Sequence, residues 1–227
     1  ADSCFQKTRP LVALWGDSHA SSLYPGLNYL QEKFEFGLTQ LTQAGCPPIF
    51  YLEKLKYSIR CNEINNNVFS GLVKTRPDII ILHAAWRHDD YPLSNEELGV
   101  RIKQTIAQIK IRLPDSKIIL VGPVPRWNDS PQKEAFNYWK NSLKKTEAIP
   151  QYLNANVLKD VENTLIGVAS DLSVNYLSST DILCFDSKCL WRVGGGKEDF
   201  LAVDYGHLSR AGSIYLAEKL FPHLKIK

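Results

Sequence analysis

Short, mostly apolar runs that alternate with longer helix-like segments constrain the fold of this chain most strongly. The runs at 11–15 (LVALW), 79–83 (IIILH) and 117–121 (KIILV) are typical of strands buried on both faces of a parallel sheet. A further short strand is expected at 36–41 and a weaker one at 168–172. Strands that alternate with helices predict an α/β protein with a mainly parallel sheet of about five strands.

Apolar spacing and cap residues predict the helices between these strands. The expected helices run from 17 to about 34, from 61 onward, over 94–113 with Ser94 at its start, in two pieces between 131 and 163 broken near Pro150, and from Ser209 onward. The segment 178–203 is predicted to be a loop. Since no linker or repeat interrupts the pattern, residues 1–227 are predicted to form one domain, in which residues 1–10 are an extension from a longer parent protein.

Composition and charge exclude several functional classes. An apolar content of 44% and a charged content of 22% are ordinary for a soluble globular protein. The net charge of +3, without a basic cluster interleaved with aromatic residues, predicts no nucleic-acid partner. No apolar run reaches the roughly 20 residues that span a bilayer. The chain begins Ala-Asp-Ser and has no Met, so we expect it to be a processed or excised piece of a longer protein.

Five cysteines lie in two close pairs and one single position. Cys46 and Cys61 frame one loop, Cys184 and Cys189 frame a small polar turn, and Cys4 stands alone. These spacings fit two local disulfides and therefore an oxidising compartment. No C-x-x-C or H-x-x-x-H spacing supports a metal site, so none is predicted. Buried free thiols in a cytosolic protein remain the alternative that the spacing leaves open.

The first predicted strand ends in a turn that carries a serine. Gly16 stops the strand, and Asp17-Ser18 open the next helix. This turn lies at the carboxyl edge of the sheet, where open α/β sheets bind ligands. A backbone N–H at a helix N-terminus also favours a developing negative charge. The alternative is that Asp17 or Ser18 only caps the helix.

A second polar stretch, Asp204-Tyr205-Gly206-His207, precedes the last predicted helix. A carboxylate three residues before a histidine can fold back onto one imidazole nitrogen and leave the other free to act as a base. A serine hydroxyl needs such a base to become a nucleophile. Ser18, His207 and Asp204 are therefore a candidate acyl-transfer set. The alternative is that Asp204 and His207 only cap the last helix.

Together these stretches resemble the SGNH (GDSL-like) hydrolases, and most closely the SGNH domains fused behind acyltransferase-3 membrane proteins. The resemblance spans 11–221 and is carried by GDSHA at 16–20, GCPP at 45–48, GPVP at 122–125, Asp204-x-x-His207 and HLSRAG at 207–212. It implies a three-layer α/β/α flavodoxin-like fold and O-acetylation of a bacterial surface polysaccharide such as lipopolysaccharide O-antigen.

The same resemblance implies partners and a location. The expected partners are a polysaccharide acceptor and a fused transmembrane domain that supplies acetyl groups from cytoplasmic acetyl-CoA. This part of the protein would lie in the periplasm, bind no cofactor of its own and be a monomer when isolated.

The family's oxyanion hole consists of the serine N–H, a glycine N–H after the second strand and an asparagine side chain after the third. Ser18 matches the first position and Gly45 the second. The asparagine is missing and Arg87 falls in its place, where a guanidinium could stabilise an oxyanion by charge. The alternative is that Arg87 pairs with Asp89 or Asp90 at the surface.

Three further residues near these motifs are singled out. Trp86 is a candidate sugar-stacking platform, although buried packing is the commoner fate of tryptophan. His19, next to the nucleophile, either shapes the turn or contacts the acyl group. His83 lies inside an apolar strand and is expected to be a hydrogen-bonded core residue.

The first functional hypothesis is O-acetyl transfer through an acetylated Ser18 to a sugar hydroxyl. The second keeps the same residues but uses water as acceptor, which gives a carbohydrate O-acetylesterase. The third is a catalytically inert glycan-binding module.

Overall fold

A computed structural model of the chain describes residues 6–50, 58–86, 93–143, 146, 148–150, 155–186 and 188–226. Its main sheet has five strands in the order β2-β1-β3-β4-β6, and every neighbouring pair is parallel. The strands are β1 (Leu11–Gly16), β2 (Gly37–Thr42), β3 (Ile79–His83), β4 (Lys117–Val121) and β6 (Asn175–Leu177). The predicted α/β class with a parallel sheet is confirmed.

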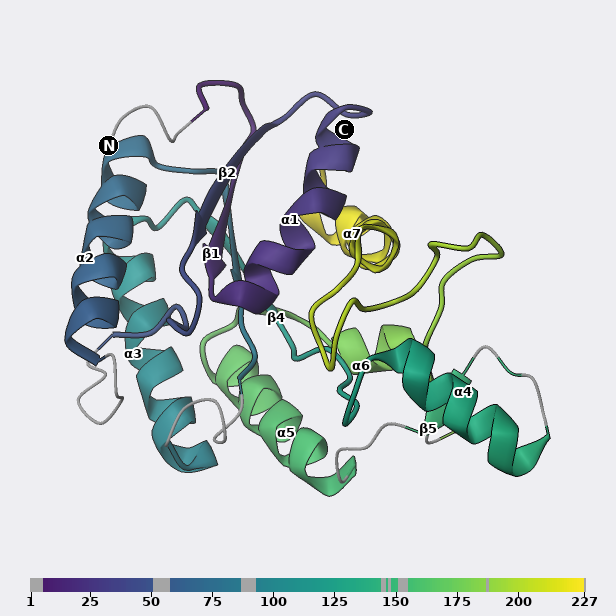
Figure 1. Cartoon of the computed structure of the whole chain (residues 1–227). Coiled ribbons are helices and arrows are strands. Elements are labelled where there is room, and N and C mark those ends of the chain that lie inside the picture. The colour runs from purple at the N-terminus through teal and green to yellow at the C-terminus, as the bar shows by residue number, and fades with distance from the viewer. Residues whose placement is uncertain are drawn as a thin grey trace.

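Helices cover both faces of this sheet (Figure 1). Helices α1 (Ser18–Gln31) and α7 (Arg210–Leu224) pack on one face. Helices α2 (Ser58–Thr75), α3 (Asn95–Arg112) and α5 (Ala155–Asp171) pack on the other. Successive strand residues alternate between the two cores, so that Leu14 joins the first and Trp15 the second. This burial on both faces explains why the strands are nearly continuous apolar runs.

The predicted fifth strand at 168–172 is wrong. Residues 155–171 form α5, and the fifth strand of the sheet is β6 at 175–177. Leu165, Val168 and Ala169 are buried at helical spacing against the second core. A short apolar run does not by itself distinguish a strand from a buried helix face, and here packing against α3 decides for the helix.

The prediction that 178–203 is a loop is wrong for its first half, which forms regular secondary structure. It contains α6 (Ser179–Leu183), β7 (Cys184–Phe185) and β8 (Lys188–Leu190). The predicted helix break near Pro150 is confirmed: strand β5 (Ala148–Pro150) lies there, after α4 (Pro131–Ser142). Strand β5 pairs with β8 to complete a small antiparallel sheet. These strands are too short to show a periodicity in the sequence.

Both predicted serine caps are confirmed. The Ser94 hydroxyl accepts the Glu97 N–H, and the Glu97 carboxylate accepts the Ser94 N–H in return, which is a complete capping box. The Ser209 hydroxyl accepts the Gly212 N–H. The second cap starts α7 three residues after His207, so the position of α7 determines where that histidine lies.

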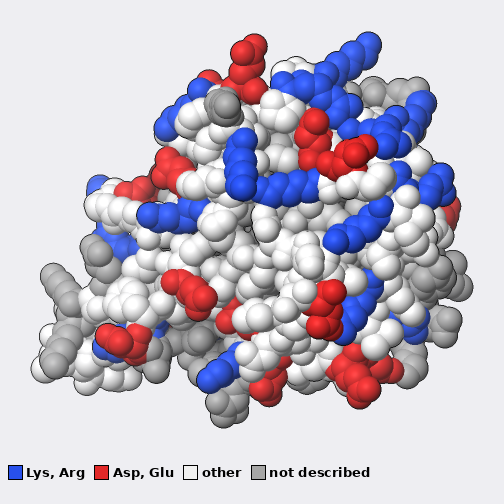
Figure 2. Space-filling model, turned by 180° about the vertical axis from the view of Figure 1, so that it is seen from behind, with Lys and Arg blue, Asp and Glu red and all other residues white. Residues whose placement is uncertain are grey.

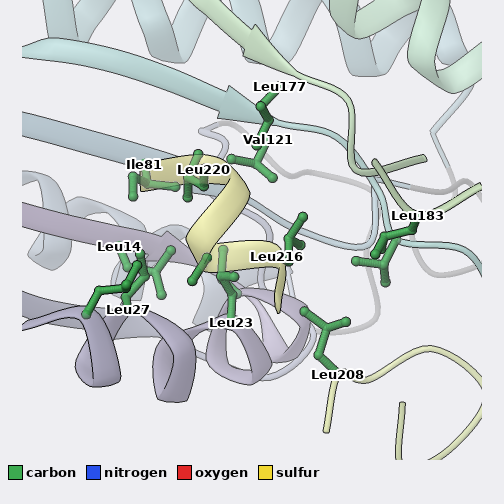
Figure 3. Packing of buried hydrophobic residues seen from close by; sticks show 14 of the residues in the cluster. Leu14, Leu23, Leu27, Ile81, Val121, Leu177, Leu183, Leu208, Leu216 and Leu220 are labelled. Atoms are coloured by element: carbon green, nitrogen blue, oxygen red, sulfur yellow. The ribbon is translucent and has the colours of Figure 1, made fainter. Parts of the chain in front are cut away.

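The N-terminal helix α1 and the C-terminal helix α7 pack closely against each other. Leu23 and Leu27 of α1 lie beside Leu216 and Leu220 of α7 over the sheet (Figure 3). The Gly26 N–H donates to the Ser213 hydroxyl at 2.8 Å, and that hydroxyl donates to the Leu23 carbonyl at 2.9 Å. These contacts join the two ends of the polypeptide.

Both predicted disulfides are present, Cys46–Cys61 and Cys184–Cys189. Cys4 lies outside the described residues. No helix in the described part of the chain is long and apolar enough to cross a membrane. On the face shown in Figure 2, acidic and basic side chains are interspersed, in keeping with the small net charge.

Candidate active site

Asp17 caps α1 and leaves the Ser18 hydroxyl available for another contact. One carboxylate oxygen of Asp17 accepts the His19 N–H at 2.8 Å. The other accepts the Ala85 N–H at 3.0 Å, from the segment that follows β3. Asp17 is therefore the residue that caps α1, and it is buried. The same carboxylate links the turn after β1 to the turn after β3 at the carboxyl edge of the sheet.

Ser18, His207 and Asp204 form a continuous chain of hydrogen bonds across the two ends of the sequence. The Ser18 Oγ lies 2.8 Å from His207 Nε2, although the two residues are 189 positions apart. His207 Nδ1 lies 2.8 Å from the Asp204 Oδ2. Since a carboxylate can only accept, the neutral imidazole carries its proton on Nδ1, and Nε2 accepts from the serine hydroxyl. This is the arrangement that a general base needs to activate a hydroxyl nucleophile.

The backbone around Asp204 supports that carboxylate. Its Oδ1 accepts the N–H groups of Gly206 at 3.0 Å and His207 at 2.8 Å. Burial by itself would raise the pKa of Asp204, but these two N–H groups, and then the His207 ring, outweigh it, so the pKa lies below its ordinary value of 3.8. The carboxylate therefore remains ionised to a lower pH than an ordinary aspartate does, and any stability it contributes is lost only as the pH falls through its lowered pKa.

The segment that carries His207 is attached directly to α1. The Leu208 N–H donates to the Ser22 hydroxyl at 3.2 Å, and that hydroxyl donates to the His19 carbonyl at 2.8 Å. Ser18 and Ser22 are one helical turn apart, so α1 holds both the hydroxyl and the backbone that positions the base.

Changing Asp204 to asparagine is expected to lower turnover of a chromogenic acetyl ester by about 10³–10⁴-fold. An amide can donate to the imidazole and so permits the wrong tautomer, in which Nε2 carries the proton and cannot accept from Ser18. The rate with p-nitrophenyl acetate near neutral pH measures the effect, and thermal unfolding checks that the variant folds. A variant that keeps more than a tenth of the wild-type rate would contradict this role for Asp204.

The predicted oxyanion donors are only partly described. Ser18 opens the 14-residue helix α1, whose N-terminus favours negative charge. Gly45 lies in the turn after β2 with a φ of +72°, a conformation that favours glycine, and its Cβ position faces open space. The Gln43 N–H donates to the Gly16 carbonyl at 3.0 Å and so ties this turn to the Ser18 turn. Arg87 lies outside the described residues.

The Cys46–Cys61 disulfide fastens the Gly45 turn to α2, and its removal is expected to affect stability and turnover together. Changing both cysteines to alanine opens a loop of 15 residues, which predicts a loss of about 3 kcal/mol in the free energy of unfolding. If the Gly45 N–H is an oxyanion donor, turnover should fall as well, because the bridge no longer holds the Gly45 turn against α2. Denaturant unfolding and acetyl ester hydrolysis measure the two effects.

The matched control for this variant is the Cys184/Cys189 double alanine variant. That bridge spans 5 positions, so its loss is expected to cost about 2 kcal/mol and to leave turnover unchanged. Equal losses of turnover in both variants would contradict a specific role for the Gly45 turn.

Two predicted substrate contacts are not supported by the structure. The Trp86 side chain is fully buried and its indole N–H donates to the Val121 carbonyl at 2.8 Å, so it presents no face to a sugar. His19 is 2% exposed, and its ring packs against His207 and Arg126 rather than facing open space. His83 is fully buried beside the Val121 carbonyl, as predicted for a core residue.

Two residues at the site were given no role by the sequence analysis. Arg126 is buried and lies 2.9 Å from the His19 ring. Tyr205 packs its edge against the His207 ring at 5.5 Å between centroids. Arg126 follows GPVP at the carboxyl end of β4. Because ligands bind at this edge of an open α/β sheet, its position in the sequence marked it as a candidate site residue. Among the described residues, no cluster of His, Cys, Asp or Glu is arranged to hold a metal ion.

One family model matches nearly the whole chain. A family model described as "SGNH domain (fused to AT3 domains)" matches residues 1–222. The periplasmic domain of the Salmonella ser. Paratyphi A lipopolysaccharide acetyltransferase superposes with a TM-score of 0.87 at 27% identity, over 98% of this chain and 86% of that one. Comparison with curated protein sequences gave no match.

More distant structures share only the fold. The acetyl xylan esterase AlAXEase superposes with a TM-score of 0.59 at 13% identity, covering 94% of this chain and 98% of that one. A peptidoglycan O-acetylesterase superposes with a TM-score of 0.54 at 16% identity, covering 84% of this chain and 47% of that one.

Proposed function

Because the chain belongs to the family of SGNH domains that are fused to AT3 domains, we propose that it transfers acetyl groups to a hydroxyl of a bacterial surface polysaccharide. The observation that carries the proposal is the Ser18–His207–Asp204 chain, with 2.8 Å at each side-chain contact. The likeness to a lipopolysaccharide acetyltransferase domain supports acetyl as the group and a glycan as the acceptor.

In the first half-reaction Ser18 Oγ attacks the acetyl carbonyl carbon while His207 Nε2 takes the serine proton. The Asp204 carboxylate keeps the His207 ring oriented and stabilises the imidazolium that forms on it. The negative charge on the carbonyl oxygen is stabilised by the N–H groups of Ser18 and Gly45, with Arg87 as the proposed third donor. When the tetrahedral intermediate collapses, His207 returns the proton to the leaving group and acetyl-Ser18 remains.

In the second half-reaction a sugar hydroxyl replaces the leaving group. His207 Nε2 takes the proton of that hydroxyl, whose oxygen attacks the acetyl-serine carbonyl. Collapse of the second intermediate returns the proton to Ser18 and releases the O-acetylated sugar. Water in place of the sugar would give acetate, so transfer requires that the glycan reach acetyl-Ser18 before water does.

The remaining parts of the proposal concern location and supply. We propose that this domain lies in the periplasm, where its two disulfides are stable. We further propose that a fused AT3 membrane domain delivers acetyl groups that originate from cytoplasmic acetyl-CoA, and that this chain binds no cofactor itself.

Acetyl transfer can be tested with the purified chain, p-nitrophenyl acetate as donor and a chemically deacetylated O-antigen polysaccharide as acceptor. We expect mass spectrometry to find an acetylated peptide that contains Ser18, and NMR to find new O-acetyl signals on the glycan. Acetate release with an acetylated Ser18 but an unmodified glycan would indicate an esterase. Absence of Ser18 acetylation would favour a glycan-binding module and contradict the enzymatic proposal.

A further inference from the structure

Two aromatic rings pack against the imidazole of His207 in addition to its hydrogen-bond partners. The His19 ring lies 4.6 Å away between centroids, tilted by 35°, and the Tyr205 ring meets it edge-on at 5.5 Å. His19 comes from α1 and Tyr205 from the segment before α7.

A buried arginine contacts both of these rings. Arg126, in the segment after β4, is 6% exposed. Its Nη2 lies 2.9 Å from His19 Nε2, and its guanidinium carbon lies 5.1 Å from the centre of the Tyr205 ring. The next residue, Trp127, donates its backbone N–H to the Tyr205 carbonyl at 2.9 Å. The β4 segment is therefore joined to both rings that flank the base.

The Arg126 contact determines the protonation state of His19. A guanidinium carries only donors, so His19 Nε2 must be the acceptor and the proton of the neutral ring must lie on Nδ1. Protonation of Nε2 would set N–H against N–H beside a permanent positive charge. His19 is therefore held neutral next to a base that itself becomes an imidazolium in each half-reaction, when a second cation at van der Waals distance would oppose proton transfer.

We propose that Arg126 is a positioning residue for acyl transfer, which fixes the tautomer and orientation of His19 and, with His19 and Tyr205, keeps the His207 ring directed at Ser18. The proposal rests on the proposed function for the role of His207 as base. Arg126 contacts His19 and Tyr205, and it acts on His207 through these two rings.

The test compares three variants of the full chain. Arg126→Met removes the donors and keeps the volume, and Arg126→Lys keeps a charge and a donor. Arg192→Met is the matched control, because Arg192 also lies over an aromatic ring, 5.5 Å from the centre of Trp191, but in another part of the fold. The readouts are kcat and KM for p-nitrophenyl acetate, thermal unfolding, and the His19 tautomer from ¹⁵N–¹H long-range correlation NMR.

We expect Arg126→Met to lower kcat by about 10–100-fold with KM changed less than about twofold, since a misdirected base slows chemistry without weakening binding. Arg126→Lys should recover most of kcat, and Arg192→Met should match the wild type. In NMR, wild-type His19 should carry its proton on Nδ1, and Arg126→Met should lose that preference.

Several results would overturn the inference. A wild-type His19 protonated on Nε2, an unchanged kcat in Arg126→Met, or a rise in KM alone would each do so. If Arg126→Met does not fold, the wild-type tautomer and the Arg126→Lys kinetics decide. If turnover depends on Ser18 but not on Arg126, this inference alone is contradicted. If the wild-type protein shows no Ser18-dependent turnover, both the proposed function and this inference are contradicted.

Discussion

Replacing Ser18 by alanine is expected to lower acetyl transfer by about 10⁴-fold or more while leaving the fold intact. The hydroxyl is the only described partner of His207 Nε2 that could be acylated, and removal of the nucleophile from such a set abolishes nearly all of its covalent chemistry. Without an acyl-serine, neither transfer to glycan nor hydrolysis can proceed. Initial rates with p-nitrophenyl acetate, together with mass mapping of the acylated peptide, measure the effect.

The neighbouring Ser21→Ala variant is the control for this experiment. Ser21 lies on the same helix, is exposed and accepts a hydrogen bond from Gln40 Nε2 at 3.0 Å, away from the imidazole. We expect it to retain wild-type turnover and wild-type thermal stability. Full turnover in Ser18→Ala would contradict the formation of an acyl-serine at this residue. Equal losses of turnover in Ser18→Ala and Ser21→Ala would contradict it as well.

Replacing Gly26 by alanine is expected to lower the free energy of unfolding by about 3 kcal/mol. A Cβ at this position would lie 2.1 Å from the Ser213 carbonyl oxygen and 2.8 Å from the Ala217 Cβ. The first of these neighbours is backbone, so the clash can be relieved only by moving α1 and α7 apart. That movement would also break the Gly26–Ser213–Leu23 hydrogen bonds.

The same change should reduce catalysis, because α7 follows directly after His207. A displacement of about 1 Å between nucleophile and base costs on the order of 10²-fold in rate. Chemical denaturation and acetyl ester turnover of Gly26→Ala measure the two effects. Gly167→Ala is the control, since Gly167 is an exposed helical glycine whose Cβ position is open, and it should be neutral or slightly stabilising. Unchanged stability in Gly26→Ala would show that the helices do not need this close approach.

The structural elements that sequence patterns predicted well are those with strong local signals. The strands at 79–83 and 117–121 coincide with β3 and β4, because burial on both faces leaves a continuous apolar run. The helices after Ser94 and Ser209 begin where their caps were expected, because capping is a contact within four residues. The close cysteine pairs also form the bridges that their spacing suggested.

The errors arose where distant parts of the chain decide the outcome. The run at 168–172 was predicted to be a strand but ends α5, since helix and strand differ there only in what they pack against. Trp86 was a candidate sugar-stacking platform, but the alternative of buried packing holds: its indole is buried and donates to the Val121 carbonyl of the neighbouring strand. Arg126 went unnoticed because its place after GPVP marks only the ligand-binding edge of the sheet, and the contact with His19, 107 positions away, depends on the tertiary fold.

The sequence by itself determined the class of the fold, the positions of strands β1 to β4 and of the Ser94 and Ser209 caps, and the identity of a serine, a histidine and a carboxylate suited to acyl transfer. These properties follow from burial, periodicity and hydrogen bonding between near neighbours. Only the tertiary structure decided that Ser18 and His207 meet at 2.8 Å and that Arg126 joins the rings around the base. Those contacts depend on the packing of α7 against α1 and on the order of strands in the sheet, which no local stretch of the chain encodes.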